Sequence, residues 1–134
     1  AADGNWSMNY NSVSLTAFSG VSVGVHNSFR LSMSREIAAG SCSPLMVVRT
    51  DANGQAVAAV GMENITLSTA SITGTFHSAG VCDVGSDIGT TLTFNAGDKA
   101  KLIYFKTSNM AAGATITATN GGNSGSVSPI NVNY

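Results

Sequence analysis

Apolar and small polar residues alternate along most of this chain, with a period of two residues. That period is typical of β-strands with one buried face, and the wider spacing of a helix is nearly absent. The predicted strands cover residues 6–10, 13–17, 21–25, 29–33, 65–67, 72–76, 92–94, 102–105, 116–118 and 130–134. Because turn residues separate them at short and even intervals, the pattern predicts an all-β sandwich or barrel.

One turn between these strands has a clear chemical explanation. Asn53-Gly54 lies between two apolar runs, near residues 45–50 and 55–60. Both residue types tolerate the positive φ angles that a tight hairpin requires. The sequence therefore predicts a β-hairpin closed at Asn53-Gly54.

Two further segments have recognisable local patterns. Residues 95–98, Asn-Ala-Gly-Asp, separate the apolar runs at residues 91–94 and 101–105, which predicts a second hairpin. Residues 35–39 are the one short stretch with the pattern of a helical turn, and Ser34 is placed to cap it.

Residues 120–125, Asn-Gly-Gly-Asn-Ser-Gly, predict a flexible loop before the last strand, because glycine loses more conformational freedom on ordering than any other residue. Pro129 lies inside that last strand and predicts an edge position or a bulge, since proline has no N–H to donate. No linker, repeat or heptad divides the chain. We therefore expect residues 1–134 to form a single domain, a common size for one hydrophobic core.

Charged residues make up only 10% of the chain, well below the roughly 25% of an average soluble domain. Lys and Arg number 6 and Asp and Glu number 7, so a net charge of −1 provides no positive field to attract nucleic acid or anionic lipid. No apolar run approaches the length of about 20 residues that a membrane-spanning helix requires. Nucleic acid and membrane insertion are therefore not expected.

The first four residues, Ala-Ala-Asp-Gly, lack an initiator methionine and are typical of a chain that a signal peptidase has cut after small residues. We therefore expect an exported, extracellular protein. Cys42 and Cys82 are the only cysteines, and an even pair in an exported chain predicts a disulfide. Neither is spaced from a histidine or from the other cysteine as in zinc sites and redox motifs.

Few residues offer catalytic or metal-binding chemistry. His26 and His77 are the only histidines and lie far apart, so surface or strand-end positions are expected for both. Asp83 and Asp87 flank a glycine, as in a calcium loop, but a polar turn is the favoured interpretation because the remaining calcium ligands are missing. The glutamates are isolated, so a glycosidase-type carboxylate pair is not expected, and neither enzyme activity nor a metal or cofactor is predicted.

The two ends of the chain carry further alternating runs. In residues 5–15 apolar residues alternate with small polar ones, as in a strand able to enter a groove on another sheet. Residues 126–134 alternate as far as the final Tyr134. With the processed start, a cysteine pair about 40 residues apart and a glycine shortly before the final tyrosine, this layout resembles the fimbrial subunits of bacterial chaperone–usher pili.

The resemblance implies an immunoglobulin-like β-sandwich that lacks one strand, which the N-terminal extension of the next subunit supplies as a permanent β-augmentation. Residues 1–17 would be that donor-strand extension. The groove-filling side chains would be Trp6, Met8 and Tyr10, or Val13, Leu15 and Ala17 after a one-residue shift at Ser12. A periplasmic chaperone would dock on the C-terminal assembly strand, at Ile130, Val132 and Tyr134.

The function expected from this resemblance is that of a pilin-like structural subunit of an extracellular surface filament. Exported through the periplasm, the chain would polymerise with itself and present a surface to a host ligand. Two alternatives stay open. One is a lectin-like or adhesin binding module that uses aromatic and amide side chains, and the other is a shell component of a virus or surface layer.

Overall fold

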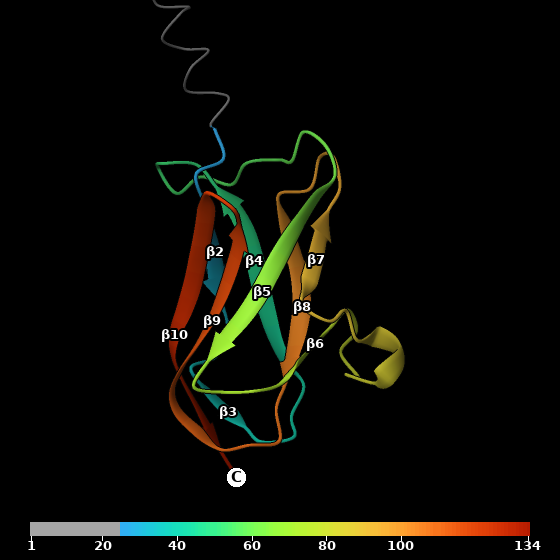
Figure 1. The fold of residues 1–134 in the computed structure, drawn as a ribbon, viewed down its shortest axis with the longest axis vertical. Helices are drawn as coiled ribbons and strands as arrows, with labels where there is room; N and C mark the ends of the chain where they lie inside the picture. Colours follow the sequence, from blue (N-terminus) through green and yellow to red (C-terminus); the bar gives the residue numbers. More distant parts are fainter. Residues whose placement is uncertain (1–24) are drawn as a thin grey trace, which may run out of the picture.

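The computed structural model describes residues 25–134, which fold into two facing β-sheets (Figure 1). The four-stranded sheet has the order β2 (Ser28–Ser32), β4 (Ser43–Thr50), β8 (Ala100–Lys106) and β6 (Thr75–His77). The five-stranded sheet has the order β3 (Glu36–Ala38), β10 (Asn123–Asn133), β9 (Ala111–Asn120), β5 (Glu63–Ala70) and β7 (Thr91–Phe94). The chain is therefore an all-β, immunoglobulin-like sandwich, as the resemblance implied.

The hydrophobic core lies between the sheets and is built from alternate residues of nearly every strand. From the four-stranded sheet, Leu45, Val47 and Phe105 are fully buried. From the five-stranded sheet the fully buried side chains include Ile65 and Ile116. The period-two pattern of the sequence agrees with this burial in most strands, but residues 47–50 at the end of β4 are all buried.

The predicted turn at Asn53-Gly54 is confirmed, but the hairpin that it closes is short. Gly54 has a φ of +82°, and the Asp51 carboxylate accepts hydrogen bonds from the backbone N–H groups of Asn53 and Gln55. The second arm pairs back only through a bridge between Thr50 and Ala56. The prediction of a strand near residues 55–60 is therefore wrong beyond that bridge.

The predicted second hairpin is wrong, although its turn is present. The Asp98 carboxylate accepts from the Asn95 N–H and closes the turn. However, β7 pairs with β5 in one sheet, whereas β8 pairs with β4 and β6 in the other. Two strands that face each other across a core show the same alternation as two strands that pair, so the pattern alone does not distinguish these arrangements.

Residues 35–39 form an extended segment, so the predicted helical turn is wrong. Within it, β3 pairs in parallel with the end of β10, where Ile37 lies opposite Val132. Ile37 is buried between the exposed Glu36 and Ala38, which is the alternation of a strand. Burial of the Ile37 side chain in the core outweighs the weak preference of residues 35–39 for a helical turn.

Residues 120–125 are ordered, and the prediction of a flexible loop there is also wrong. Gly121 and Gly122 connect β9 directly to β10, with Asn120 paired to Asn123. Gly121 has a φ of +77°, the left-handed backbone that a two-residue hairpin turn requires. The glycines therefore serve a tight turn.

The long strand β10 connects both ends of the sandwich. Its register with β9 shifts between Val127 and Ile130, on either side of Pro129, so the predicted bulge is confirmed. Nearer its start, Gly125 packs against the backbone of Phe29 in β2, and a Cβ atom at this glycine would collide with the Phe29 carbonyl oxygen. This contact brings β2 and β10 together and closes one side of the sandwich.

Candidate functional site: the chain ends and the inter-sheet polar network

The predicted disulfide is confirmed. Cys42 directly precedes β4, and Cys82 lies in the segment between β6 and β7; their Cα atoms are 5.8 Å apart. The bond ties the start of a central strand to a long connection outside the sheets. It therefore stabilises the fold and leaves no free thiol among the described residues.

Of the residues predicted for assembly, those of the candidate donor strand, from Trp6 to Ala17, lie outside the described residues. The C-terminal residues are described. Ile130 and Val132 are buried in the core of their own chain, whereas Tyr134 is largely exposed. Residues 131–133 pair with β3, and Val132 also pairs with Ala111 of β9. A role for this strand in docking a chaperone stays a prediction.

The described chain begins and ends at opposite ends of the sandwich (Figure 1). The His26 ring lies 3.4 Å from the side-chain amide of Asn123, the first residue of β10. The chain then ends at Tyr134, one residue beyond the 11-residue strand. At about 3.3 Å per residue, the ends are separated by roughly 30 Å, the length of the domain.

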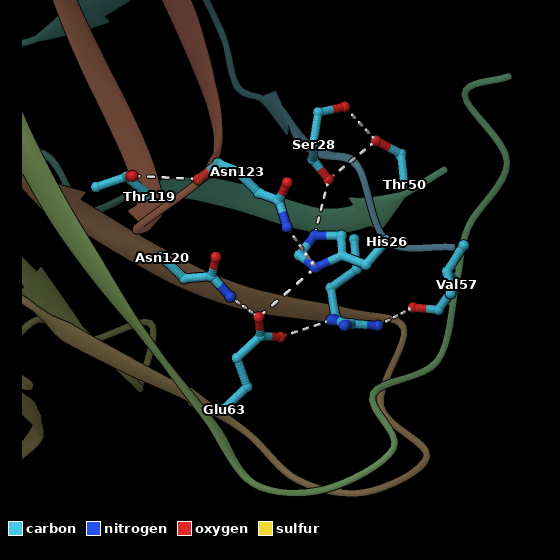
Figure 2. A network of polar contacts seen from close by, with 9 residues as sticks. His26, Ser28, Thr50, Val57, Glu63, Thr119, Asn120 and Asn123 are labelled. Atoms are coloured by element: carbon cyan, nitrogen blue, oxygen red, sulfur yellow. Dashed lines mark hydrogen bonds and ion pairs between the residues drawn. The ribbon is translucent and has the colours of Figure 1, made fainter. Parts of the chain in front are cut away.

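A buried ion pair connects the two sheets at the end that carries His26 (Figure 2). Arg49 Nε, from β4, donates to Glu63 Oε1, from β5, at 2.7 Å. Arg49 is only 6% exposed, and its Nη1 also donates to the Val57 carbonyl at 2.7 Å. The Asn120 side-chain amide donates to the other Glu63 oxygen. Each charge is therefore paired and hydrogen-bonded, as burial requires.

His26 joins this network from the segment that leads into β2. Its Nε2 donates to the Ser28 carbonyl at 3.0 Å, and its Nδ1 lies 3.6 Å from Glu63 Oε2. Burial and the positive charge of Arg49 lower the pKa of His26, and the Glu63 carboxylate only partly opposes them. His26 is therefore held mainly neutral near pH 7, where its Nδ1 accepts a hydrogen bond from Asn123.

A second candidate region is an open groove of about 440 Å³ beside β6 and the connection from β8 to β9, with both apolar and polar lining. Its lining includes Thr73, Thr75, Lys106, Ser108, Asn109 and His77. His77 ends β6 and is buried, and its two ring nitrogens contact Thr75 Oγ1 at 2.7 Å and the Asp83 carbonyl at 3.0 Å. Both nitrogens are therefore engaged in structural hydrogen bonds.

The aspartates considered for calcium form turns, as favoured from the sequence. Asp83 caps a short 3₁₀ turn, Val84–Ser86, by accepting from the Ser86 N–H at 3.0 Å. Asp87 accepts from the Gly89 N–H at 2.7 Å. Across residues 25–134, no three His, Cys, Asp or Glu side chains gather as metal ligands would. The same part of the chain contains no helix suited to crossing a membrane.

Sequence reasoning missed the network of Arg49, Glu63 and His26. A faint signal was present, because Arg49 follows three apolar residues in the predicted strand near residues 45–50 and Glu63 lies two residues before the strand predicted at residues 65–67. A charge at such a position predicts either an exposed edge or a buried pair. The partner comes from another sheet, however, so only the fold reveals it.

No family model and no curated protein sequence matches the chain. Among solved structures, a glycosyl hydrolase family 2 member from Bacteroides cellulosilyticus DSM 14838 is similar over 79% of this chain, with 19% identity and a TM-score of 0.58. The matched part is 15% of that protein's length. The sulfur carrier protein SoxY from Chlorobium limicola f thiosulfatophilum has 11% identity over 92% of this chain and 100% of its own, with a TM-score of 0.42.

The first of these likenesses supports the sandwich fold and nothing further, because one fold carries many unrelated functions. The second has too low a TM-score to support an argument. Function therefore rests on the geometry of this chain.

Proposed function

We propose that this chain is a non-catalytic structural subunit of an extracellular surface filament, in which each subunit joins the next through a donated N-terminal strand. The observation that carries the proposal is the place where the described chain begins. It begins at one end of the sandwich, so a copy that receives the preceding residues would lie beyond that end, and repetition of the same contact would extend a line of copies (Figure 1).

The sequence outside the described residues supplies a suitable connector. Residues 5–24 contain no charged residue and no proline, and residues 6–10 and 13–17 alternate as strands do. A separate strand of this kind exposes apolar side chains and unpaired backbone groups until it pairs with a sheet. Pairing with a neighbouring copy would bury both sets of groups together, which favours a long-lived junction.

The buried network suits a subunit that bears load at its ends. The Arg49–Glu63 pair joins β4 to β5, and His26 bonds the entering chain to the Ser28 carbonyl of β2 and to Asn123 of β10. The junction between the extension and the domain is thus attached to both sheets. The disulfide supports an oxidising, extracellular setting, because such bonds are rare in the reducing cytosol.

The experiment compares two full-length variants with the parent by size exclusion and electron microscopy. In the first, Trp6, Met8 and Tyr10 are all changed to serine; in the matched control, the interleaved Ser7, Asn9 and Asn11 are changed to alanine. We expect the parent and the control to form filaments and the first variant to remain monomeric. Monomers from the parent at all concentrations would contradict the proposal.

A third variant tests the other candidate register, with Val13 and Leu15 changed to serine. Loss of filaments in this variant alone would assign the contacts to residues 13–17. Filaments from both serine variants would show that neither apolar run forms the junction.

A binding module is the second candidate function, and the groove beside β6 is the observation that favours it. The hydroxyl and amide side chains of Thr73, Thr75 and Asn109 line this groove and suit a neutral polar ligand such as a glycan. A glycan array probed with the full chain and with Asn109→Leu tests it. Binding that disappears in Asn109→Leu would support the module.

A further inference from the structure

Each sheet of a sandwich has two edge strands, and an edge exposes backbone N–H and C=O groups that can pair with another chain. The four edges here are β2 and β6 in one sheet and β3 and β7 in the other. Three of them are blocked by residues of the same chain.

The β2 edge is covered by β10, because Gly125 packs directly against the Phe29 backbone. On the β3 edge, serine side chains form hydrogen bonds with the outward backbone groups. In β3, Ser34 Oγ donates to the Glu36 carbonyl and also accepts from the Glu36 N–H, while Ser41 Oγ donates to the Ala38 carbonyl. The β2 edge is thus covered by packing, and on the β3 edge the Glu36 N–H, the Glu36 C=O and the Ala38 C=O are already bonded to serine side chains.

The β6 edge is occupied by the segment that follows the 3₁₀ turn. His77 forms a bridge with Asp87, and the Ile88 N–H donates to the Phe76 carbonyl at 2.9 Å. The Ser78 N–H donates to the Ser86 carbonyl at 2.8 Å. A further strand therefore has no place along β6.

The β7 edge differs from the other three. Leu67 N–H donates to the Thr90 carbonyl, and the same register pairs Leu92 with Ile65. In an antiparallel pair, only every second residue of a strand forms backbone hydrogen bonds to its partner strand. Leu92 and Phe94 therefore bond to β5. The N–H and C=O groups of Thr91 and Thr93 point away from β5. Within residues 25–134 these outward groups have no backbone or side-chain partner.

The side chains of β7 also lack the features that protect edges. The strand reads Thr-Leu-Thr-Phe, with no charge, no proline and no bulge. Leu92 and Phe94 are buried, and the two threonines lie on the outer face of the sheet. An incoming strand would therefore meet an uncharged edge without proline or a bulge.

We propose that β7 is the acceptor edge, and that it receives residues 6–17 of a neighbouring copy as an antiparallel sixth strand. This inference rests on the proposed function and specifies its receiving surface. The donor is uncharged and free of proline, like the acceptor. Either alternating run of the donor, residues 6–10 or 13–17, is long enough to pair with the four residues of β7.

The direction of the strands follows from the positions of the chain ends. Phe94 lies opposite Glu63, which contacts His26, so β7 runs toward the end where the described chain begins. A neighbouring copy that lies beyond the opposite end of the sandwich would place its extension along the β7 edge. The N-terminus of that extension would lie nearest Phe94, and its C-terminal part would lie nearest Thr91. Its chain direction is then opposite to that of β7, which makes the pairing antiparallel.

The segment between the donor run and the neighbour's domain is long enough to reach β7. Thr91 pairs with Thr66, which is four residues from Ala70 at the end of β5, a distance of about 13 Å. Residues 18–24 connect the donor run to the neighbour's domain and span up to roughly 24 Å when extended. About 10 Å remains for the gap between domains. The same extension folded back onto its own β7 would instead run parallel to it.

The first test uses Thr93→Pro in the full chain, which removes one outward N–H and leaves the bonds of Leu92 and Phe94 to β5 in place. The matched control is Ala38→Pro, which places proline on the blocked β3 edge. We expect the concentration needed for filament assembly to rise about tenfold or more in Thr93→Pro, because backbone hydrogen bonds and close strand contact are lost together. The control should assemble as the parent does. Equal assembly by Thr93→Pro and the parent would overturn the inference.

The second test follows amide hydrogen exchange of the parent in dilute and assembled samples, and does not depend on how the proline variants fold. We expect Thr91 and Thr93 to exchange at least tenfold more slowly in filaments, while Leu92 and Phe94 are protected in both samples. Filaments whose Thr91 and Thr93 still exchange fast would overturn the β7 assignment and leave the proposed function standing.

The remaining outcomes of that test are also decisive. Protection of Thr91 and Thr93 in dilute monomers would show that the chain's own extension occupies the edge, which overturns donation between copies at β7. A parent chain that never assembles would remove the proposed function and this inference with it.

Discussion

Arg49 has its charge balanced inside the sandwich by the Glu63 carboxylate, so the two residues are expected to depend strongly on each other. Glu63→Ala would leave a guanidinium buried without its counter-charge. We expect a loss of about 3–5 kcal/mol in the free energy of unfolding, measured by urea denaturation. The double variant Arg49→Met, Glu63→Leu should recover most of that loss, because it removes both charges. A Glu63→Ala protein as stable as the parent would show that solvent reaches the pair.

His26 should make stability depend on pH below neutrality. Its pKa is lowered in the folded protein, so the unfolded chain binds the proton more tightly. The stabilising contribution of neutral His26 is fully present above the unfolded pKa of about 6.5 and decreases as the pH falls from there through the lower folded pKa. We expect the melting temperature to fall between pH 7.5 and pH 5, and to fall less steeply in His26→Gln. Identical slopes for both proteins would contradict the assignment.

At the scale of elements, two glycines allow a comparison between backbone strain and close packing. Gly54 has a positive φ but open space around it, whereas a Cβ at Gly125 would collide with the Phe29 carbonyl. We expect Gly54→Ala to cost about 1 kcal/mol through backbone strain alone, and Gly125→Ala to cost about 3 kcal/mol because β2 and β10 must separate. Chemical denaturation of both variants measures the difference. Equal costs would indicate that β2 yields easily.

The elements also show how far the sequence determines this fold. Alternation located most of the strands and placed Leu92 and Phe94 on one face, but residues 102–105 are all apolar, so the sequence did not show which of them face inward. It did not predict that β7 and β8 belong to different sheets, since pairing depends on contacts distant in the sequence. The strand at Ile37 was missed because its parallel partner, the end of β10, is nearly 100 residues away.

At the scale of the whole molecule, the disulfide constrains a large part of the chain. Cys42 and Cys82 are separated by 40 positions. In the chain-entropy model, closing such a loop contributes about 4 kcal/mol, a large share of a small domain's stability. We expect the double variant Cys42→Ala, Cys82→Ala to lose about this amount in urea denaturation. The parent measured with a reductant should lose a similar amount, and an unchanged midpoint in both cases would contradict the prediction.

The candidate site was predictable only in part. Cysteine count and context predicted the disulfide correctly, because those features are local to the sequence. The inter-sheet network and the open β7 edge depend on which strands are neighbours. Arg49 and Glu63 come from different sheets, and Thr91 and Thr93 become an edge only because no strand lies beyond them within the described residues.

The parallel pairing of β3 with the end of β10 has a mechanical consequence. If a single domain is held at residue 25 and at residue 134 and stretched, the force acts along the length of the domain. β3 is then drawn toward one end and β10 toward the other, so their backbone bonds around Ile37 and Val132 are loaded in shear. Bonds loaded in shear share the force and break together, whereas bonds pulled open from one end break one after another. This short pairing would therefore set the force at which a domain stretched between these two residues begins to unravel.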